Sequence, residues 1–481
     1  MSLSSALANA VSGLRANSQA ARIVSDNISN ALNENYTRRS VTLEQNAIRA
    51  AGGVRVTGIN RATNGVANSD WRIANGQVAS LDTQTSALSR ITQVYGLPSE
   101  SGSLQNLVTK FESELVSASS RPDLPQRLTS VAYAASDIAT KLNEISDVIQ
   151  AERITADSEI AISVGRINEI LTSLQDLNAR SGGTDPSSLA AAGLYDQRDS
   201  LLDELSGYME IRVFPRDHGR VAVYSSGGIG LLDGTPAELS FSQTPVITAN
   251  HSLGAGTLSA LEIAGNTIDA TRLSGGSLAT QFDIRDSIAV DAQSELDAFA
   301  FEFSARVNDP AIDTTRTAID PGFFTDNGAF IDVANLVGLS ERISLNASVD
   351  PKESGDPALF RDGLLSLGGG DVGDSSVLLG LSETMQDPGS VGFGSYAGLQ
   401  ISLPNLAANL GSNFASGLNR SESHMTFAQS QKSASNDLRM VNRVDSDAEL
   451  QQLIVIEQAY GANAQVIQVI DDLMDTLLGM V

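Results

Sequence analysis

The chain has 481 residues, a formal net charge of −26 and no cysteine. This excess of acidic groups argues against nucleic acid and anionic membranes as partners, because both attract clustered lysine and arginine. The missing cysteines exclude disulfides and thiolate metal sites. The length suggests roughly three domains, and no window approaches the ~18 consecutive apolar residues of a membrane span. The first thirty residues lack the basic start and apolar run of a secretory signal.

The N-terminal residues carry an apolar seam with alternating steps of three and four. Its members are Leu3, Leu7, Ala10, Leu14, Asn17, Ala21, Val24, Ile28 and Ala31. This period predicts a helix that lies against another helix. The helix is expected to end among the asparagines of residues 30–35. Extended segments are then predicted for residues 36–43 and 54–56.

Helical periodicity recurs in the first half of the chain. It covers residues 68–95, 104–121, 128–181 and 195–205. In the third of these stretches the apolar seam changes phase between Ile149 and Ile160. A helical run of this length predicts long antiparallel rods that end near Gly182.

The middle of the chain has a different pattern. Apolar residues alternate from Ile211 onward, with turn signals at residues 217–219 and 233–234, and predict short antiparallel strands that continue to about Ser274. Residues 282–307 are expected to be helical. Glycine, aspartate and serine then dominate residues 309–394, which predicts a loop-rich insertion with some β structure. A polar helix is expected over residues 399–443.

A second apolar seam closes the chain. Its members are Leu453, Ile456, Tyr460, Asn463, Ile467, Ile470, Met474, Leu477 and Val481. Such a stripe also fits an ordinary core face. A stripe at each end of the chain, however, needs a partner in the other terminus or in another molecule. The single asparagine in each seam fits a device that fixes register at some cost in stability.

These patterns predict an α+β multidomain protein with paired N- and C-terminal coiled-coil helices, a long-helix bundle domain and central β-rich domains. Residues 1–62 and 430–481 are expected to form an axial coiled-coil core. The rest of the chain is assigned to three parts, namely a helical rod domain from residues 63–210, 275–308 and 395–429, a β-rich domain at 211–274, and the insertion at 309–394.

Catalytic chemistry is not indicated. His218, His251 and His424 stand in polar or turn-like contexts without a positioned nucleophile or carboxylate. Residues 368–373 match the glycine spacing of dinucleotide sites, but Asp371 stands where a pyrophosphate would approach, so a flexible loop is expected. We therefore expect no catalytic residue, no cofactor and no metal. An enzyme would require carboxylate pairs that only the fold brings together.

Several motifs resemble those of bacterial flagellar axial proteins. Residues 12–14 and 27–30 resemble their opening, and residues 457–467 resemble their closing motif. Three more discriminating stretches, residues 36–38, 195–205 and 275–286, resemble flagellar hook-associated protein type 1. That family usually has glycine where this chain has Asn35. Because asparagine is the next residue best able to adopt a left-handed backbone, the turn is expected to survive.

The resemblance implies a structural protein that forms the junction between hook and filament by helical subunit packing. The implied partners are further copies in a helical ring, the hook protein, a second junction protein and an export chaperone at the C-terminal helix. It also implies an extracellular place in the flagellum after export without a cleaved signal peptide. Another axial protein (hook, filament or second junction protein) remains an alternative, as does, less favoured, a cell-wall-acting enzyme.

The expected assembly interface consists of seam residues from both ends. They are Leu3, Leu7, Leu14, Asn17, Val24, Ile28, Leu453, Ile456, Tyr460, Asn463, Ile467, Ile470, Met474 and Leu477. An isolated pair of helices with small seam residues buries too little to offset the roughly 1–2 kcal/mol per residue of ordering entropy. We therefore expect the terminal helices to gain order when neighbouring subunits cover them.

Overall fold

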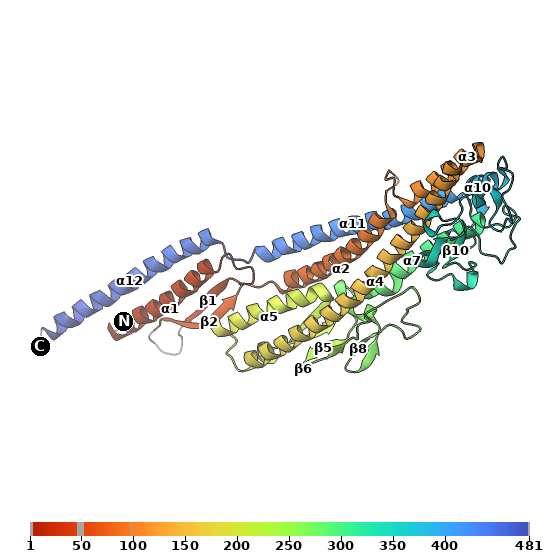
Figure 1. Ribbon diagram of the computed structural model, residues 1–481. Helices are drawn as coiled ribbons and strands as arrows, with labels where there is room; N and C mark the ends of the chain where they lie inside the picture. The colour runs from red at the N-terminus through yellow and green to blue at the C-terminus, as the bar shows by residue number, and fades with distance from the viewer. Residues whose placement is uncertain (1–2, 46–51, 98, 480–481) are drawn as a thin grey trace.

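The computed structural model describes residues 3–45, 52–97 and 99–479 and is elongated, with long helices as its main elements (Figure 1). Helices α1 (Leu3–Ser29) and α12 (Ser446–Leu478) lie side by side at one end. Helices α2 (Gly65–Tyr95) and α11 (Leu403–Met440) pack along the middle. The chain therefore runs out from the terminal pair and returns to it.

The predicted fold class is confirmed, including the paired terminal helices, the helical middle and the central strands. The helices expected over residues 68–95 and 104–121 are α2 and α3 (Leu104–Ser120). The one expected over residues 195–205 lies within α5 (Leu189–Tyr208). Local sequence explains several starts, because Asn64, Ser103 and Ser188 each accept a hydrogen bond from a backbone N–H of the first turn.

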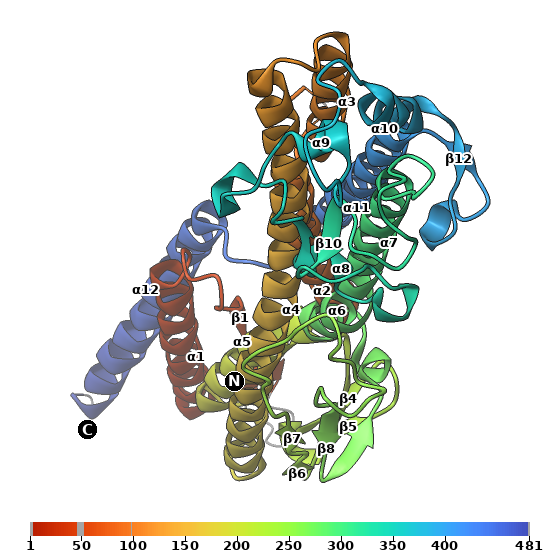
Figure 2. The same ribbon diagram turned by 45° about the vertical axis from the view of Figure 1, so that its right-hand side comes forward.

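The expectation of antiparallel rods over residues 128–181 is wrong, because one continuous helix, α4 (Pro125–Gly182), spans them. Figure 2 shows α4 running from the strand-rich part of the molecule towards α9 and α10. Its two seams face two separate cores. Residues from Leu128 to Ile149 belong to one apolar cluster, and residues from Ile160 to Leu174 belong to another. The phase change thus marks where a single helix passes between cores.

The core around Ile160–Leu174 is closed by small sheets. A four-stranded antiparallel sheet has the order β3 (Ile211–Pro215), β4 (Val221–Ser225), β5 (Gly230–Asp233) and β6 (Thr235–Pro236). A second sheet has the order β7 (Leu239–Ser240), β8 (Leu261–Ile263) and β9 (Asn266–Ile268). Inward residues such as Val223 and Leu232 are fully buried against α4 and α5. The strands predicted for this region are therefore present.

The other core lies around α3, the first half of α4, and α7 (Ala289–Val307). Helix α7 continues from α6 (Ser277–Asp283) through a π-helical turn at Ile284–Ile288. Gly276 precedes α6, and a Cβ atom there would lie 2.3 Å from the carbonyl carbon of Tyr208. Only glycine allows this approach, which gives a physical reason for the glycine pair at residues 275–276.

The prediction of a loop-rich insertion with some β structure at residues 309–394 missed three helices. These are α8 (Leu339–Arg342), α9 (Leu359–Asp362) and α10 (Ser376–Gln386). Two antiparallel strand pairs are also present. They are β10 (Phe324–Asp326) with β11 (Ile343–Leu345), and β12 (Gly389–Ser390) with β13 (Gln400–Ile401), which lies just beyond the region. These segments bury apolar residues in the core of α3, α4 and α7, and α10 does so with residues at helical spacing, Leu378, Leu381 and Met385.

The structure also bears on the expected turn at Asn35 and on the expected domain boundary at residue 430. The turn expected at Asn35 is present, since the Tyr36 N–H donates to the Asn33 carbonyl oxygen at 3.0 Å. Asn35 is not among the described non-glycine residues with positive φ, so the backbone there is not left-handed and the position does not need glycine. Helix α11 continues past residue 430 to Met440, so the expected boundary at 430 falls inside a helix. The domain division itself stays a prediction. None of the described helices has the length and apolar character that a bilayer span requires.

Candidate functional site: the terminal helix pair and its polar joint

Helices α1 and α12 run antiparallel, with both chain ends at the same tip of the molecule (Figure 1). The side chain of Asn463 packs against α1 at Gly13, where a Cβ atom would lie 2.9 Å from both Nδ2 and Oδ1 of Asn463. Asn463 in turn donates from Nδ2 to the carbonyl oxygen of Ala459 at 2.9 Å. The asparagine predicted to set register in α12 therefore meets a glycine of α1.

The predicted interface residues are distributed unevenly. Val24, Ile456 and Ile470 are buried. Half-buried members are Leu3, Leu14, Asn17, Ile28, Leu453, Asn463 and Ile467, and exposed members are Leu7, Tyr460, Met474 and Leu477. Val481, the last residue of the predicted seam, lies outside the described residues. The seam is thus covered mainly within one chain, and its role in assembly stays a prediction.

A second apolar line on α12 was missed by the sequence reasoning. We call it the outer stripe, and it consists of Val455, Ala462, Val466, Val469 and Leu473. The side chains of Val455 and Val469 are 62% and 57% exposed. Steps of three, four and seven place these residues on one face of the helix, beside the face that meets α1. The same periodicity that found the seam could have found this stripe.

Asn27 fastens α1 to both neighbouring elements. Its Nδ2 donates to the carbonyl oxygen of Arg39 at 2.8 Å and to Glu449 Oε2 at 2.9 Å. Its Oδ1 accepts from the Tyr36 hydroxyl at 2.8 Å and from the Arg39 N–H at 3.1 Å. Glu449 is fully buried and also accepts from Arg38 Nε at 2.6 Å. We call this group the Asn27 clamp, and it joins α1, α12 and the segment leading into β1.

Sequence reasoning quoted Asn27, Tyr36 and Arg38 only as parts of motifs, and it did not name Glu449. The buried Asn27 amide uses both its Nδ2 and its Oδ1 in hydrogen bonds. One of its partners, Glu449, is more than 400 positions away in the sequence. Periodicity cannot reveal such a group. Burial raises the pKa of Tyr36 to about 12, because its hydroxyl lies away from water while Arg39 only partly offsets the effect.

A row of alternating charges connects the terminal helices to the rest of the molecule. We call it the arginine–aspartate ladder, and its members are Arg39, Asp196, Arg61, Asp199, Arg72, Asp203 and Arg439. Successive members are separated by 2.6–3.8 Å from nitrogen to oxygen. The three aspartates project from one face of α5, because they are spaced by three and four residues.

The arginines of the ladder come from four different elements. Arg39 and Arg61 stand on the hairpin of β1 (Arg39–Gln45) and β2 (Val54–Arg61), which pair in antiparallel fashion. Arg72 stands on α2 and Arg439 on the last turn of α11. Desolvation opposes the charge of Asp199, yet Arg198, Arg61 and Arg72 together hold its pKa below the usual range. The ladder is therefore a charged joint in which each carboxylate is neutralised by arginine.

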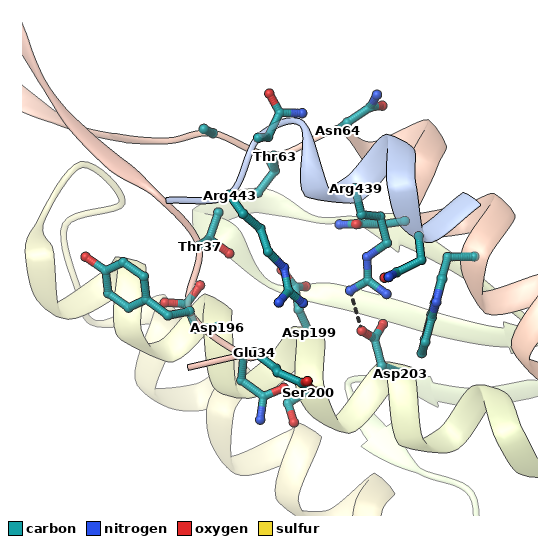
Figure 3. Close-up of a pocket in the computed structure, with 17 residues that line it drawn as sticks. Glu34, Thr37, Thr63, Asn64, Asp196, Asp199, Ser200, Asp203, Arg439 and Arg443 are labelled. Carbon is teal, nitrogen blue, oxygen red and sulfur yellow. Dashed lines mark hydrogen bonds and ion pairs between the residues drawn. The ribbon is translucent and has the colours of Figure 1, made fainter. Parts of the chain in front are cut away.

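A cavity of about 200 Å³ lies over this joint (Figure 3). Arg439 from α11 reaches across it to Asp203, and its guanidinium lies 4.3 Å from the ring centre of Trp71. Arg443 comes from the linker between α11 and α12 and also lines the cavity. The cavity wall is thus formed by the segments that connect the terminal helices to the rod.

The three histidines lie apart from this joint. His218 occupies a turn with φ 57°, His251 accepts the Thr248 N–H at its Nδ1, and His424 lies exposed on α11. Among the described residues, no three histidine or acidic side chains are grouped so that they could hold a metal ion. The contacts at this site hold the two terminal helices together and connect them to the rest of the molecule.

Comparison with known proteins gives two family matches. Residues 88–311 match the helical domain of flagellar hook-associated protein FlgK, and residues 443–480 match the C-terminal region of the flagellar basal body rod proteins FlgEFG. The second match covers the end of the linker after α11 and the whole of α12.

Relatives show the same resemblance over different lengths. Flagellar hook-associated protein 1 of Bacillus subtilis (strain 168) is 26% identical and aligns with 97% of this chain and 96% of that protein. The protein of the same name from Salmonella typhimurium is 28% identical over 49% of this chain and 44% of its own length. A solved structure of the flagellar hook junction protein FlgK from Burkholderia pseudomallei has a TM-score of 0.43 and 20% identity over 54% of this chain and 47% of that chain.

Proposed function

The chain belongs to the flagellar hook-associated protein 1 family, whose members are structural components of the bacterial flagellum, and we propose that it builds the hook–filament junction through its terminal helices. The observation that supports this role most directly is the α1–α12 pair. It stands at one tip of the rod and leaves the outer stripe of α12 uncovered. Apolar surface of this kind gains free energy when neighbouring subunits cover it.

The proposed partners follow from a junction role. Further copies of the chain would form a helical ring through the terminal pairs, with the hook protein on one side and a second junction protein on the other. An export chaperone would cover α12 before assembly, since that helix carries the largest uncovered apolar face of the terminal unit. The protein is located in the flagellum, and we propose that it reaches its extracellular place through the flagellar export route without a cleaved signal peptide.

We propose that this role is structural rather than catalytic. The carboxylates that the fold gathers at the joint are each bound by arginine, as in Arg61 with Asp196 and Arg439 with Asp203. Carboxylates held in this way serve as anchors, because catalysis of acid–base type needs a pKa tuned near the working pH and access to a substrate. The family to which the chain belongs supports the same conclusion.

Electron microscopy of cells that lack this protein tests the junction role. We expect complete hooks without filaments, and flagellin released into the medium. Restoring the full chain should restore attached filaments. Filaments that attach normally in its absence would contradict the junction role.

A seam variant tests the part played by the helices. Ile467→Asp places a carboxylate in the half-buried seam beside Asn463, where desolvation is costly. We expect the variant chain to fold its rod normally but to fail in restoring filaments. Glu457→Gln, on an exposed position of the same helix, is the matched control and should restore them.

A further inference from the structure

The terminal unit has a second uncovered apolar surface, on a different element from the outer stripe. A groove of about 710 Å³ runs between α1 and β2. Its apolar lining comes from Leu7, Ala8, Val11, Val54 and Val56. No residue of α12 is among the described residues that line it, so the stripe and the groove are separate surfaces of one chain.

The charges of these two surfaces are complementary. Arg15 and Arg55 are the charged residues among those lining the groove, and both are basic. Helix α12 carries acidic residues at Asp447, Glu449, Glu457, Asp471, Asp472 and Asp475 and no lysine or arginine. In a chain of net charge −26, copies repel one another in general. A basic groove is therefore the surface on which an acidic helix of a second copy can rest.

One arginine of the groove has no ion-pair partner among the described residues of its own chain. Arg55 pairs with Glu44 at 3.2 Å, whereas Arg15 forms no ion pair with the described residues. Arg15 lies exposed on α1, one turn away from Val11. Its guanidinium is thus available to an acidic side chain that flanks an inserted helix, and Asp472 is placed beside the outer stripe by the helical period.

We propose that the outer stripe of α12 from one copy docks into the α1–β2 groove of a second copy of this chain. This inference rests on the proposed function and specifies the contact through which the ring is built. Because the two surfaces differ, the contact is head-to-tail, and each copy keeps one free stripe and one free groove for the next. Such contacts generate rings or helical arrays rather than closed dimers.

Disulfide cross-linking tests the contact directly, since the chain contains no cysteine of its own. Two full-length chains with different tags, one with Ala8→Cys and one with Val469→Cys, are expressed together in cells that lack the natural protein. Hook–filament complexes are isolated and oxidised. We expect disulfide dimers that contain both tags, which can form only between two copies.

Matched variants define the geometry. Gln468→Cys is exposed and adjacent to Val469 but lies off the stripe, and Ser18→Cys is exposed on α1 outside the groove. Using Gln468→Cys in place of Val469→Cys, or Ser18→Cys in place of Ala8→Cys, should lower the yield of mixed dimers to background. Arg15→Glu should lower the yield of the Ala8–Val469 dimer about fivefold, the scale of an exposed charge contact. Arg22→Glu, an exposed arginine of α1 that does not line the groove, should leave the yield unchanged.

The outcomes separate this inference from the junction role. Dimers formed only between two Val469→Cys chains would overturn it, because stripes would then pair with stripes. Correctly placed chains, shown by gold labelling at the hook–filament boundary, that give no mixed dimer would also overturn it while the junction role stands. If the chain is absent from that boundary, the junction role fails, and the same cross-linking on the purified full chain at high concentration decides the inference alone.

Discussion

The terminal unit, formed by α1, the β1–β2 hairpin and α12, and the rod around α4 are stabilised in different ways. Helix α4 buries side chains along nearly its whole length, from Leu128 to Ser181. Over its 33 residues α12 buries only Glu449, Ile456 and Ile470. In the part of the chain that the structure describes, none of the apolar core clusters includes a residue of the terminal unit. The rod thus has its own core, and the terminal unit does not.

This difference shows which part of the protein is stabilised by its own apolar core and which part is held mainly by polar contacts. Burial of apolar surface supplies the stability of the rod, and this contribution acts without precise geometry. The terminal unit is held by the Asn27 clamp and the arginine–aspartate ladder, which fix its position but add little net free energy once desolvation is counted. On our proposal, such a unit keeps its apolar faces for other copies.

The largest effect is expected from a core truncation in the rod. Phe303 is fully buried, and its ring centre lies 4.9 Å from that of Phe324 and 6.2 Å from that of Phe111. Phe303→Ala should lower the free energy of unfolding by about 3–5 kcal/mol, because it leaves a cavity. Denaturant unfolding of the purified chain measures this loss. Ile470→Ala, in the terminal unit, should leave the main transition unchanged, and an equal loss for both variants would contradict the comparison.

Breaking the Asn27 clamp should affect only the terminal unit. Asn27→Ala removes the donor to Glu449 and the acceptor for the Tyr36 hydroxyl, which leaves buried polar groups without partners at a cost of about 1–3 kcal/mol. Amide exchange of the soluble chain should become faster in α1 and α12 while the rod keeps its protection. Asn17→Ala is the control, because no hydrogen bond of the Asn17 side chain is found in the described structure. Equal effects of the two variants would show that the clamp is dispensable.

The ladder should respond to acid. The pKa of Asp199 is lowered in the folded chain, so its charge stabilises the joint above the unfolded value of about 3.9 and this contribution is lost as the pH falls through the folded value. Trp71 is the only tryptophan and lies against Arg439, so its fluorescence reports on the joint. We expect a change below about pH 4.

Two variants assign that change. Asp199→Asn should reduce the acid-induced change in Trp71 fluorescence and lower the stability of the joint at neutral pH by about 1–2 kcal/mol. Asp185 also has a lowered pKa, but its carboxylate binds the Ser187 backbone N–H and hydroxyl, away from the ladder. Asp185→Asn should therefore leave the fluorescence change as it is. A full response in Asp199→Asn would mean that other carboxylates control the joint.

Periodicity in the sequence predicts the elements whose side chains face one partner over many turns. It found the seams of α1 and α12 and both apolar faces of α4, because each repeats at helical spacing. The phase change at residues 149–160 was interpreted wrongly, because one helix that packs into two cores has the same apolar pattern as two separate helices. Helices α8 and α9 were missed because four residues are too few to show a period. Helix α10 has eleven residues and buries Leu378, Leu381 and Met385 at steps of three and four, so its period was present in the sequence and was overlooked.

Most of the candidate site could not be predicted in this way. The clamp and the ladder bring together single residues from distant segments, as Asn27 and Glu449 illustrate. Only the aspartates of α5 carried a local signal, in their spacing of three and four. Motif resemblance pointed to residues 36–38 and 195–205, where much of the polar joint lies, but it gave no reason for them. The structure supplies that reason as hydrogen bonds and charge pairs.

The smallest expected effect concerns the hydroxyl of Tyr36. Its pKa is raised to about 12, so its neutral form is favoured in the folded chain. The resulting stability is fully present below the unfolded pKa of about 10 and is lost as the pH rises from there through the folded value. Tyr36→Phe should cost about 0.5–1.5 kcal/mol at neutral pH, the scale of one hydrogen bond, because Asn27 keeps the Arg39 N–H as a donor.

Ultraviolet difference titration and amide exchange together check this effect. Wild-type α1 and α12 should lose protection as the pH rises from about 10 towards 12, and Tyr36→Phe should remove that step along with one late-titrating phenol. Tyr133→Phe, which alters a half-exposed ring on α4, should change neither. If the alkaline step persists in Tyr36→Phe, the phenol is not what couples the clamp to pH. The alkaline response would then have to come from another group, and the terminal unit would still be held by Asn27, Glu449 and the arginine–aspartate ladder.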